Sequence, residues 1–388
     1  MPVELRTTSV AAGGESVARG DDGRVVFVAG ALPGERVVVE LTEEKARWAR
    51  GRVVEVLDAS TDRVAPPCPH VADGCGGCGW QHVAHAAQGD LKAGIVADGL
   101  VRLGGVEQPV IHAGPHLDDR GFRTTVRAAV DGGRAAFRRE HSHDTVTVDA
   151  CLVAHPLIEG LLVDGRFPGA HEVTLRCGAR TGERLVVPRP VDASVEVPDD
   201  VRRDHFHEEV AGVRFRISGP SFFQARPDGA DALVAAVRAA AAGAPDGPMV
   251  DAYGGVGLFA ATVGAERDVT LVEWSSSAVA DARVNVPDAT VLRLDLGRWR
   301  PSPAALVVAD PSRAGLGAKA VRTLARTGAS HLVLVSCDPA SLGRDAKLLA
   351  AEGFVHDGTT LVDLFPHTPH VEAVTRFIRE RPSPRTPR

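Results

Sequence analysis

Three cysteines lie close together in the segment CPHVADGCGGCGWQH, at Cys68, Cys75 and Cys78. The glycines between them let the backbone turn tightly, so three thiols within eleven residues can surround one metal centre. Zinc and iron–sulfur clusters both normally take four protein ligands, and the spacing suits either. The sequence therefore predicts a metal centre and leaves its metal open. The fourth ligand would be His70, His82, His85 or a distant cysteine, of which Cys151 is the nearest.

A further cysteine, Cys337, follows the apolar run Leu-Val-Leu-Val-Ser at residues 332–336, which is typical of a buried strand. In open α/β sheets, chemistry takes place at the carboxyl ends of such strands. A helix predicted to begin at 340–342 would favour the thiolate, the form in which cysteine is a nucleophile. A second loop, Asp310-Pro-Ser-Arg313, ends the preceding strand at the same edge. By position alone Cys337 fits a nucleophile and a buried structural cysteine equally well.

A glycine-rich turn, Asp251-Ala-Tyr-Gly-Gly-Val-Gly-Leu-Phe-Ala260, separates a predicted strand from a predicted helix. Its Gly255-x-Gly257-x-x-Ala260 pattern is typical of nucleotide-binding turns, where missing side chains let a ligand approach the backbone. Glu273 ends the next strand, where a carboxylate can accept both hydroxyls of a ribose. The pattern suits NAD and S-adenosylmethionine alike.

Alternating helices and strands must position these groups. From residue 228 onward the sequence predicts a doubly wound α/β domain, in which parallel strands alternate with helices. A helix over 230–241 begins it. The predicted strands cover 249–251, 269–273, 290–294, 305–309 and 331–335.

The first 220 residues are richer in predicted strands. Residues 1–60 read as a five-stranded β-barrel of the kind that often binds nucleic acid, with clear strands at 24–28, 35–41 and 51–57. An amphipathic helix is expected over 84–103. Residues 105–220 predict an antiparallel sheet, with strands at 123–130, 145–148, 172–175 and 184–187.

Composition narrows the class of protein. The net charge is −6, which argues weakly against indiscriminate nucleic-acid binding, although only four of the 44 basic residues are lysine. Six cysteines are too few for a disulfide scaffold. No apolar run is long enough to span a membrane and the N-terminus lacks a signal-peptide pattern, so we expect a cytoplasmic protein.

Taken together, these motifs resemble those of the RNA 5-methyluridine methyltransferases that carry an N-terminal TRAM domain and a 4Fe–4S cluster. The resemblance covers nearly the whole chain, and the cysteine loop and the HVE motif are its most specific parts. The matching segments, in family order, are GRVVFVAGALPGERV, CPHVADGCGGCGWQH, SFFQARPDGA, DAYGGVGLFA, DPSRAG, VSCDPASLGRD and HTPHVEAV.

The resemblance implies a role for each group of residues. Cys337 would be the nucleophile that adds to carbon 6 of uracil, and Glu372 the base that removes the proton from carbon 5. Cys68, Cys75, Cys78 and Cys151 would ligate the cluster, which favours iron–sulfur over zinc. The residues expected to bind S-adenosylmethionine are Gln224, Tyr253, Gly255, Gly257, Glu273, Asp295 and Asp310.

The chain departs from the family pattern at four points. The gap after Cys68 is six residues, one longer than usual. Arg226 replaces the usual asparagine of Gln-x-Asn, Ser312 replaces a proline of Asp-Pro-Pro-Arg, and Gly254 stands where cysteine is common. These changes concern the substrate and the cofactor geometry rather than the thiol chemistry.

The expected architecture is therefore α/β with three parts. Residues 1–60 form an OB-like TRAM barrel that binds RNA, 61–220 a mixed α+β domain with the cluster, and 221–378 a Rossmann-like methyltransferase domain, with helix 84–103 packed on it and a disordered tail at 379–388. We expect a monomer that acts on structured rRNA or tRNA, rRNA being favoured. Two other functions remain open: an RNA-binding protein that has kept the scaffold without turnover, and an NAD-dependent enzyme that uses the 255–260 turn. An NAD-dependent enzyme would leave Cys337 and the cysteine segment without a role.

Overall fold

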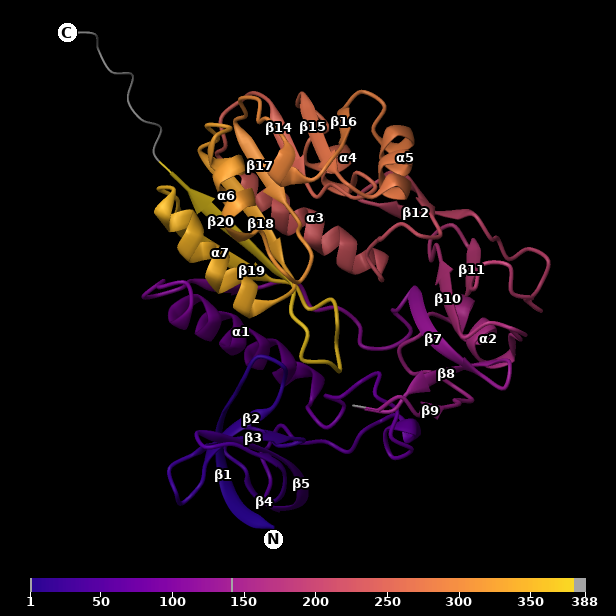
Figure 1. The fold of residues 1–388 in the computed structure, drawn as a ribbon, viewed down its shortest axis with the longest axis vertical. Helices are drawn as coiled ribbons and strands as arrows, with labels where there is room; N and C mark the ends of the chain where they lie inside the picture. The colour runs from indigo at the N-terminus through magenta and orange to yellow at the C-terminus, as the bar shows by residue number, and fades with distance from the viewer. Residues whose placement is uncertain (1, 141, 380–388) are drawn as a thin grey trace.

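The N-terminal barrel is closed, with its five strands in the order β1-β2-β3-β5-β4 (Figure 1). The structure, a computed structural model, describes residues 2–140 and 142–379; the tail predicted from 379 lies outside them except for Arg379. Alternating apolar residues such as Leu5, Val37 and Val39 point into the barrel, which gives it a core of its own. The sequence missed the two first strands, which are short or rich in threonine and serine. The strands are β1 (Val3–Val10), β2 (Ser16–Arg19), β3 (Val25–Ala29), β4 (Arg36–Glu44) and β5 (Trp48–Asp58).

The cysteine segment contains one short 3-10 turn, η1 (Pro69–Val71), and leads into α1 (His85–Arg102), the helix expected over 84–103. This helix packs against α7 (Pro339–Ala351) of the C-terminal region. The two helices touch through their backbones, because a Cβ atom on Gly99 would lie 2.6 Å from the Pro339 carbonyl oxygen. None of the described helices, α1 included, is long and apolar enough to cross a membrane.

A five-stranded sheet follows, in the order β11-β10-β7-β8-β9, and its neighbouring strands run antiparallel as predicted. The helix α2 (Pro156–Asp164) covers one face, where Ile158, Leu161 and Phe167 are fully buried. Cys177 is buried in the same core, as a small apolar residue would be. The strands are β7 (Thr125–Asp131), β8 (Arg134–Arg138), β9 (Thr145–Val146), β10 (Glu172–Cys177) and β11 (Arg184–Arg189).

The C-terminal region is built on an eight-stranded sheet, in the order β16-β15-β14-β17-β18-β20-β19-β6. The first five strands are parallel, which confirms the doubly wound prediction, and β20 runs antiparallel to β18. Its strands are β14 (Met249–Ala252), β15 (Val269–Glu273), β16 (Thr290–Arg293), β17 (Leu306–Ala309), β18 (His331–Ser336), β19 (Val355–Leu361) and β20 (Ala373–Ile378), with β6 (Ile111–Ala113) at the edge. The helices are α3 (Pro227–Ala241), α4 (Leu258–Thr262), α5 (Ser276–Asn285), α6 (Gly317–Ala325) and α7, with the short turn η2 (Leu296–Arg298).

Two elements from before residue 220 belong to this region in space. Strand β6 pairs in parallel with β19. The hairpin β12 (His205–Val210) and β13 (Val213–Ser218) contributes Phe206 and Phe215 to the core beneath the large sheet. The division of the chain at residues 60 and 220 stays a prediction.

Candidate active site and cysteine pocket

The candidate catalytic residues gather at one edge of the eight-stranded sheet. Strand β14 has β15 on one side and β17 on the other, so the chain order reverses there, and ligands bind at such a point outside the carboxyl ends of the strands. Tyr253 follows β14, Glu273 ends β15, and Asp310 follows β17. Because β20 is antiparallel, its beginning lies at this same edge.

Strand pairing brings Cys337 and Glu372 next to each other. Ser336 of β18 pairs with Ala373 of β20. Cys337 follows Ser336 and Glu372 precedes Ala373, so these two residues lie side by side at the ends of the paired strands. The Glu372 side chain is buried, at 4% exposure, and the Cys337 thiol is partly buried. A thiol and a carboxyl group at adjacent strand ends can act on the same small substrate.

Asp310 joins these two groups and alters their acidity. Burial raises the pKa of Asp310 to about 7. Burial, and then the nearby Asp310 carboxylate, raise the pKa of Glu372 well above its ordinary value. The two carboxyl groups therefore share one low-dielectric space in which the first negative charge disfavours the second. A bound cation would favour the ionised form of both.

The thiol of Cys337 is less acidic than the sequence predicts. Burial raises its pKa to about 11, with further contributions from Glu372 and Asp310, whereas Arg313 acts in the opposite direction. The net shift is therefore toward the neutral thiol, because burial outweighs the groups that favour the thiolate. The Asp338 carboxylate caps α7 by accepting a hydrogen bond of 2.6 Å from the Ser341 amide.

The glycine turn is held in shape by two carboxyl groups. Asp251 is fully buried and accepts a 2.9 Å hydrogen bond from the amide of Ala260, at the start of α4. Burial raises its pKa to about 8. Glu273 accepts from the amide of Gly255 at 3.1 Å, so this carboxylate positions the turn as well as facing the site. Gly257 has φ +96°, a left-handed conformation that favours glycine.

Tyr253 and Asp295 share the electrostatic environment of Glu273. The pKa of Tyr253 is raised to about 12, first by burial and then by Asp295, Asp345 and Glu273. Tyr253 also has φ +60°, rare for a residue with a side chain and a form of strain that often occurs at functional sites. Asp295 is exposed and begins the turn η2.

Gln224 comes from a different segment, residues 219–226 between β13 and α3. It is 8% exposed, and its neighbour Phe223 packs in the same core as Val256 of the glycine turn. Arg226, which replaces the usual asparagine, is fully buried. Its guanidinium makes two hydrogen bonds to Asp228, of 2.8 and 2.6 Å, and lies over the ring of Phe122. The Arg226 side chain is thus already bound by other residues of the protein.

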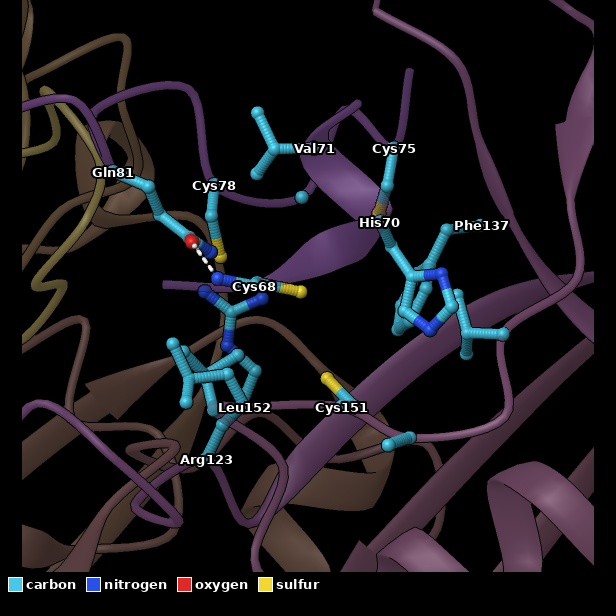
Figure 2. A pocket seen from close by; sticks show the side chains of 14 residues that line it. Cys68, His70, Val71, Cys75, Cys78, Gln81, Arg123, Phe137, Cys151 and Leu152 are labelled. Carbon is cyan, nitrogen blue, oxygen red and sulfur yellow. Dashed lines mark hydrogen bonds between the residues drawn. The ribbon is translucent and has the colours of Figure 1, made fainter. Parts of the chain in front are cut away.

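The four predicted cluster ligands line one pocket (Figure 2). Cys68, Cys75 and Cys78 come from the loop before α1, and Cys151 comes from the segment between β9 and α2. Figure 2 shows their sulfur atoms facing a common space. All four thiols are free, and no aspartate or glutamate lines the pocket. As they stand, no three His, Cys, Asp or Glu side chains among residues 2–140 and 142–379 form a site for a metal ion.

The structure separates the candidates for a fourth ligand. Both ring nitrogens of His70 contact carboxylates, Asp73 at 2.9 Å and Asp149 at 2.8 Å. His82 and His85 are not part of the pocket lining, whereas Cys151 is. Cys151 is therefore the thiol available to complete a set of four.

Hydrogen-bond donors surround these thiols. Burial raises the pKa of Cys75, and a bond from the Gly77 amide lowers it; burial likewise raises that of Cys78, while Arg123 and the Gln81 side chain lower it. The spacing of the cysteines does not indicate Arg123 as their neighbour, because only the fold brings the segment before β7 to the cysteine loop. A cation and several N–H donors would stabilise the negative charge of a metal centre ligated by these thiolates.

The chain is similar to known proteins in its sequence. Residues 2–54 match the model of the TRAM domain. The chain is 35% identical to an uncharacterised RNA methyltransferase of Streptomyces avermitilis, covering 96% of each chain. It is 29% identical to the 23S rRNA (uracil(1939)-C(5))-methyltransferase RlmD of Vibrio cholerae, covering 92% of this chain and 91% of that protein.

The fold has a close relative among solved structures. The tRNA (uracil-54, C5)-methyltransferase of Pyrococcus abyssi, in complex with S-adenosyl-L-homocysteine, superposes with a TM-score of 0.73 at 24% identity. The match covers 97% of this chain and 99% of that chain. The likeness thus extends over all parts of the molecule.

Proposed function

Because this chain belongs to the RNA 5-methyluridine methyltransferase family, we propose that it transfers a methyl group from S-adenosylmethionine to carbon 5 of a uridine in structured RNA. The observation that carries the proposal is the pairing of β18 with β20, which sets Cys337 beside Glu372. We favour rRNA over tRNA, since the relative that acts on 23S rRNA is more similar in sequence than the solved tRNA enzyme.

The two residues divide the reaction between them. Cys337, after loss of its proton, adds through sulfur to carbon 6 of uracil and places an electron pair on carbon 5. Carbon 5 attacks the methyl group of the sulfonium, and S-adenosylhomocysteine leaves. Glu372 then takes the proton from carbon 5, the double bond re-forms, and the thiolate is expelled from carbon 6. One proton is released for each methyl group transferred.

The acid-lined edge suits a positively charged methyl donor. A sulfonium bound near Asp310 and Glu372 favours their ionised forms, and Glu372 must be ionised to accept a proton. Glu273 would accept the ribose hydroxyls, with Tyr253 and Asp295 beside it. Gly255 and Gly257 would allow close approach to the turn, and Gln224 would close the site from the side of α3.

We also propose that Cys68, Cys75, Cys78 and Cys151 hold a 4Fe–4S cluster. Four thiols, N–H donors and Arg123 form a donor set for a cluster with thiolate charge. A zinc ion needs all its donors about 2.3 Å from one point, whereas a cluster spreads its four thiolates over separate irons. A bound cluster would tie the cysteine loop to the segment between β9 and α2.

Replacing Cys68 by serine tests the cluster. Protein purified without oxygen should contain iron and be brown, and Cys68→Ser should lose both iron and visible absorbance because a hydroxyl is a poor iron ligand. Cys177→Ala is the matched control and should keep both, since Cys177 is not among the residues that line the cysteine pocket. Stoichiometric zinc in the wild type would contradict the proposal of an iron–sulfur cluster. Four irons retained in Cys151→Ser would contradict the assignment of Cys151 as the fourth ligand.

The barrel is proposed to bind RNA, as TRAM-like barrels offer a nucleic-acid platform. A cytoplasmic monomer remains our expectation. The barrel's surface arginines are largely paired with acidic neighbours, as Arg36 is with Glu4 and Asp58. Phosphate contacts must therefore come in part from outside it, for which the arginines between residues 120 and 139 are candidates.

A ligand-binding and turnover assay tests the function as a whole. S-adenosylmethionine should raise the melting temperature, since a ligand that binds only the folded state stabilises it. NADH should leave it unchanged. Mass mapping of rRNA and tRNA from a deletion strain should show one uridine that has lost its methyl group. Stabilisation by NADH instead favours a dehydrogenase, and RNA binding with no lost methyl group favours a non-catalytic binder.

A further inference from the structure

The loop between β19 and β20 carries Glu372 at its end. The loop is closed at its base by a 2.8 Å hydrogen bond from the Val362 amide to the Glu372 carbonyl oxygen. Its outer part, residues 363–370, extends from the sheet toward the barrel (Figure 1). Only Val371 separates this outer part from Glu372, so a displaced loop can move Glu372 through the chain itself.

Helix α1 holds one side of the loop with two fully buried polar side chains. The Lys92 ammonium donates to the Asp363 carboxylate at 2.6 Å and to the Phe365 carbonyl oxygen at 3.0 Å. The Gln88 side-chain oxygen accepts from the His367 amide at 2.7 Å. Buried polar groups are costly to leave unpaired, so these bonds fix the loop on α1.

Trp80 holds the other side and links the loop to the barrel. Its backbone amide donates to the His367 carbonyl oxygen at 2.8 Å, and its indole Nε1 donates to the Gly14 carbonyl oxygen at 3.2 Å. His367 has φ +64°, a left-handed conformation that costs free energy without glycine and persists because its amide and carbonyl are both held. The loop is thus kept in one strained shape from both sides.

The barrel comes close to the loop at Gly14. Gly14 lies in the turn between β1 and β2, and a Cβ atom there would stand 2.5 Å from the Cβ of Pro369 and 2.7 Å from Nε1 of Trp80. Real Cβ atoms do not approach other atoms so closely, so a side chain at this position must displace the loop or the indole. Gly13, one residue earlier, has nothing within 4 Å of its Cβ position.

We infer that the β1–β2 turn of the barrel, through Gly14 and Trp80, positions the loop that carries Glu372, so that the barrel contributes to proton removal as well as to RNA binding. The inference rests on the proposed function, because it assigns Glu372 the role of base. Gly14 and Trp80 act as positioning residues, since they reach the reacting atoms only through the loop.

Gly14→Ala and Gly13→Ala form a matched pair that tests this inference in the full-length protein. Both glycines have left-handed backbones, with φ +92° and +102°, so alanine strains both, but only Gly14→Ala meets the loop. With substrate RNA and S-adenosylmethionine, Gly14→Ala should lower kcat by roughly 10- to 100-fold, because a small misplacement of a catalytic group has effects of this size. KM for RNA should stay within about twofold, and Gly13→Ala should leave both constants near the wild-type values.

The covalent adduct distinguishes a positioning role from simple loss of structure. Addition of Cys337 and methyl transfer precede proton removal, so Gly14→Ala should accumulate an enzyme–RNA adduct on a denaturing gel, and Trp80→Phe should do so more weakly. Equal behaviour of the two alanine variants, or a fall in RNA affinity that accounts for the whole loss without an adduct, overturns the inference. If Gly14→Ala does not fold, Trp80→Phe decides in the same assay. A wild-type protein that methylates no RNA refutes the proposed function instead.

Discussion

Cys337→Ala should abolish both methylation and the covalent complex with RNA. The uracil ring is a poor nucleophile at carbon 5 until a thiolate has added at carbon 6, and no other cysteine lies at this edge among the described residues. Removing such a nucleophile lowers turnover by roughly 10⁴- to 10⁶-fold. The measurements are incorporation of methyl groups from labelled S-adenosylmethionine and a denaturing gel with substrate RNA.

Binding of S-adenosylmethionine and RNA distinguishes the loss of the nucleophile from unfolding of the variant. Cys337→Ala should still be stabilised by S-adenosylmethionine and should still bind RNA, because its thiol makes neither interaction. Cys177→Ala, the matched control, should retain methylation, since Cys177 is buried in the core of the central sheet. Methylation that survives in Cys337→Ala would show that the thiol is not the nucleophile.

Glu372→Gln stops the same reaction one step later. Glutamine has the shape of glutamate but cannot accept a proton, so addition and methyl transfer remain possible while proton loss from carbon 5 does not. Turnover should fall by roughly 10²- to 10⁴-fold, the usual contribution of a general base. An adduct that depends on S-adenosylmethionine should accumulate and appear as a shifted band on a denaturing gel.

A chemical change in the RNA should reproduce this result in the wild type. RNA with 5-fluorouridine at the target carries fluorine where the proton would leave, so wild-type protein should be trapped in the same adduct. Glu352→Gln, at the end of α7 and away from the edge, serves as the control and should turn over normally. Normal turnover by Glu372→Gln would remove Glu372 from the mechanism.

The sequence predicted the five parallel strands of the catalytic sheet because their signals are local, but it did not predict β6, β19 or β20. The apolar runs of β17 and β18 are buried on both faces, as continuous runs in parallel sheets are. Cys337 could be assigned to a strand end for the same reason. The pairing of β18 with β20, which brings Glu372 to that strand end, joins segments far apart in the sequence and left no local signal.

The acidity of the site was harder to predict for a related reason. The sequence predicted a helix that would favour the Cys337 thiolate, whereas burial, which has no local signal, raises the pKa of this thiol to about 11. The closeness of Asp310 to Glu372 likewise follows from tertiary structure. Burial is the first cause of the raised pKa of Asp310, Glu372 and Cys337, and burial of this kind follows from the tertiary structure rather than from residue type.

Gln88 and Lys92 show a third limit of sequence reasoning. Amphipathic periodicity predicted α1, and polar residues in such a helix are normally expected on its solvent face. Both side chains are instead fully buried against the loop that carries Glu372. Only the partners of these residues, near the other end of the chain, explain why they are polar.

The pairing of strand β6 implies an order in which the parts of the protein fold. Its partner β19, like the loop that α1 binds, is made near the end of synthesis, and the bond between His367 and Gln88 spans 279 residues of sequence. During synthesis the N-terminal part of the chain leaves the ribosome first, so α1 and β6 are exposed long before their partners have been made. The barrel, whose contacts are local and whose core is its own, can fold during this interval. The catalytic sheet can be completed only after the last strands have left the exit tunnel, so the apolar face of α1 stays without its partners until then.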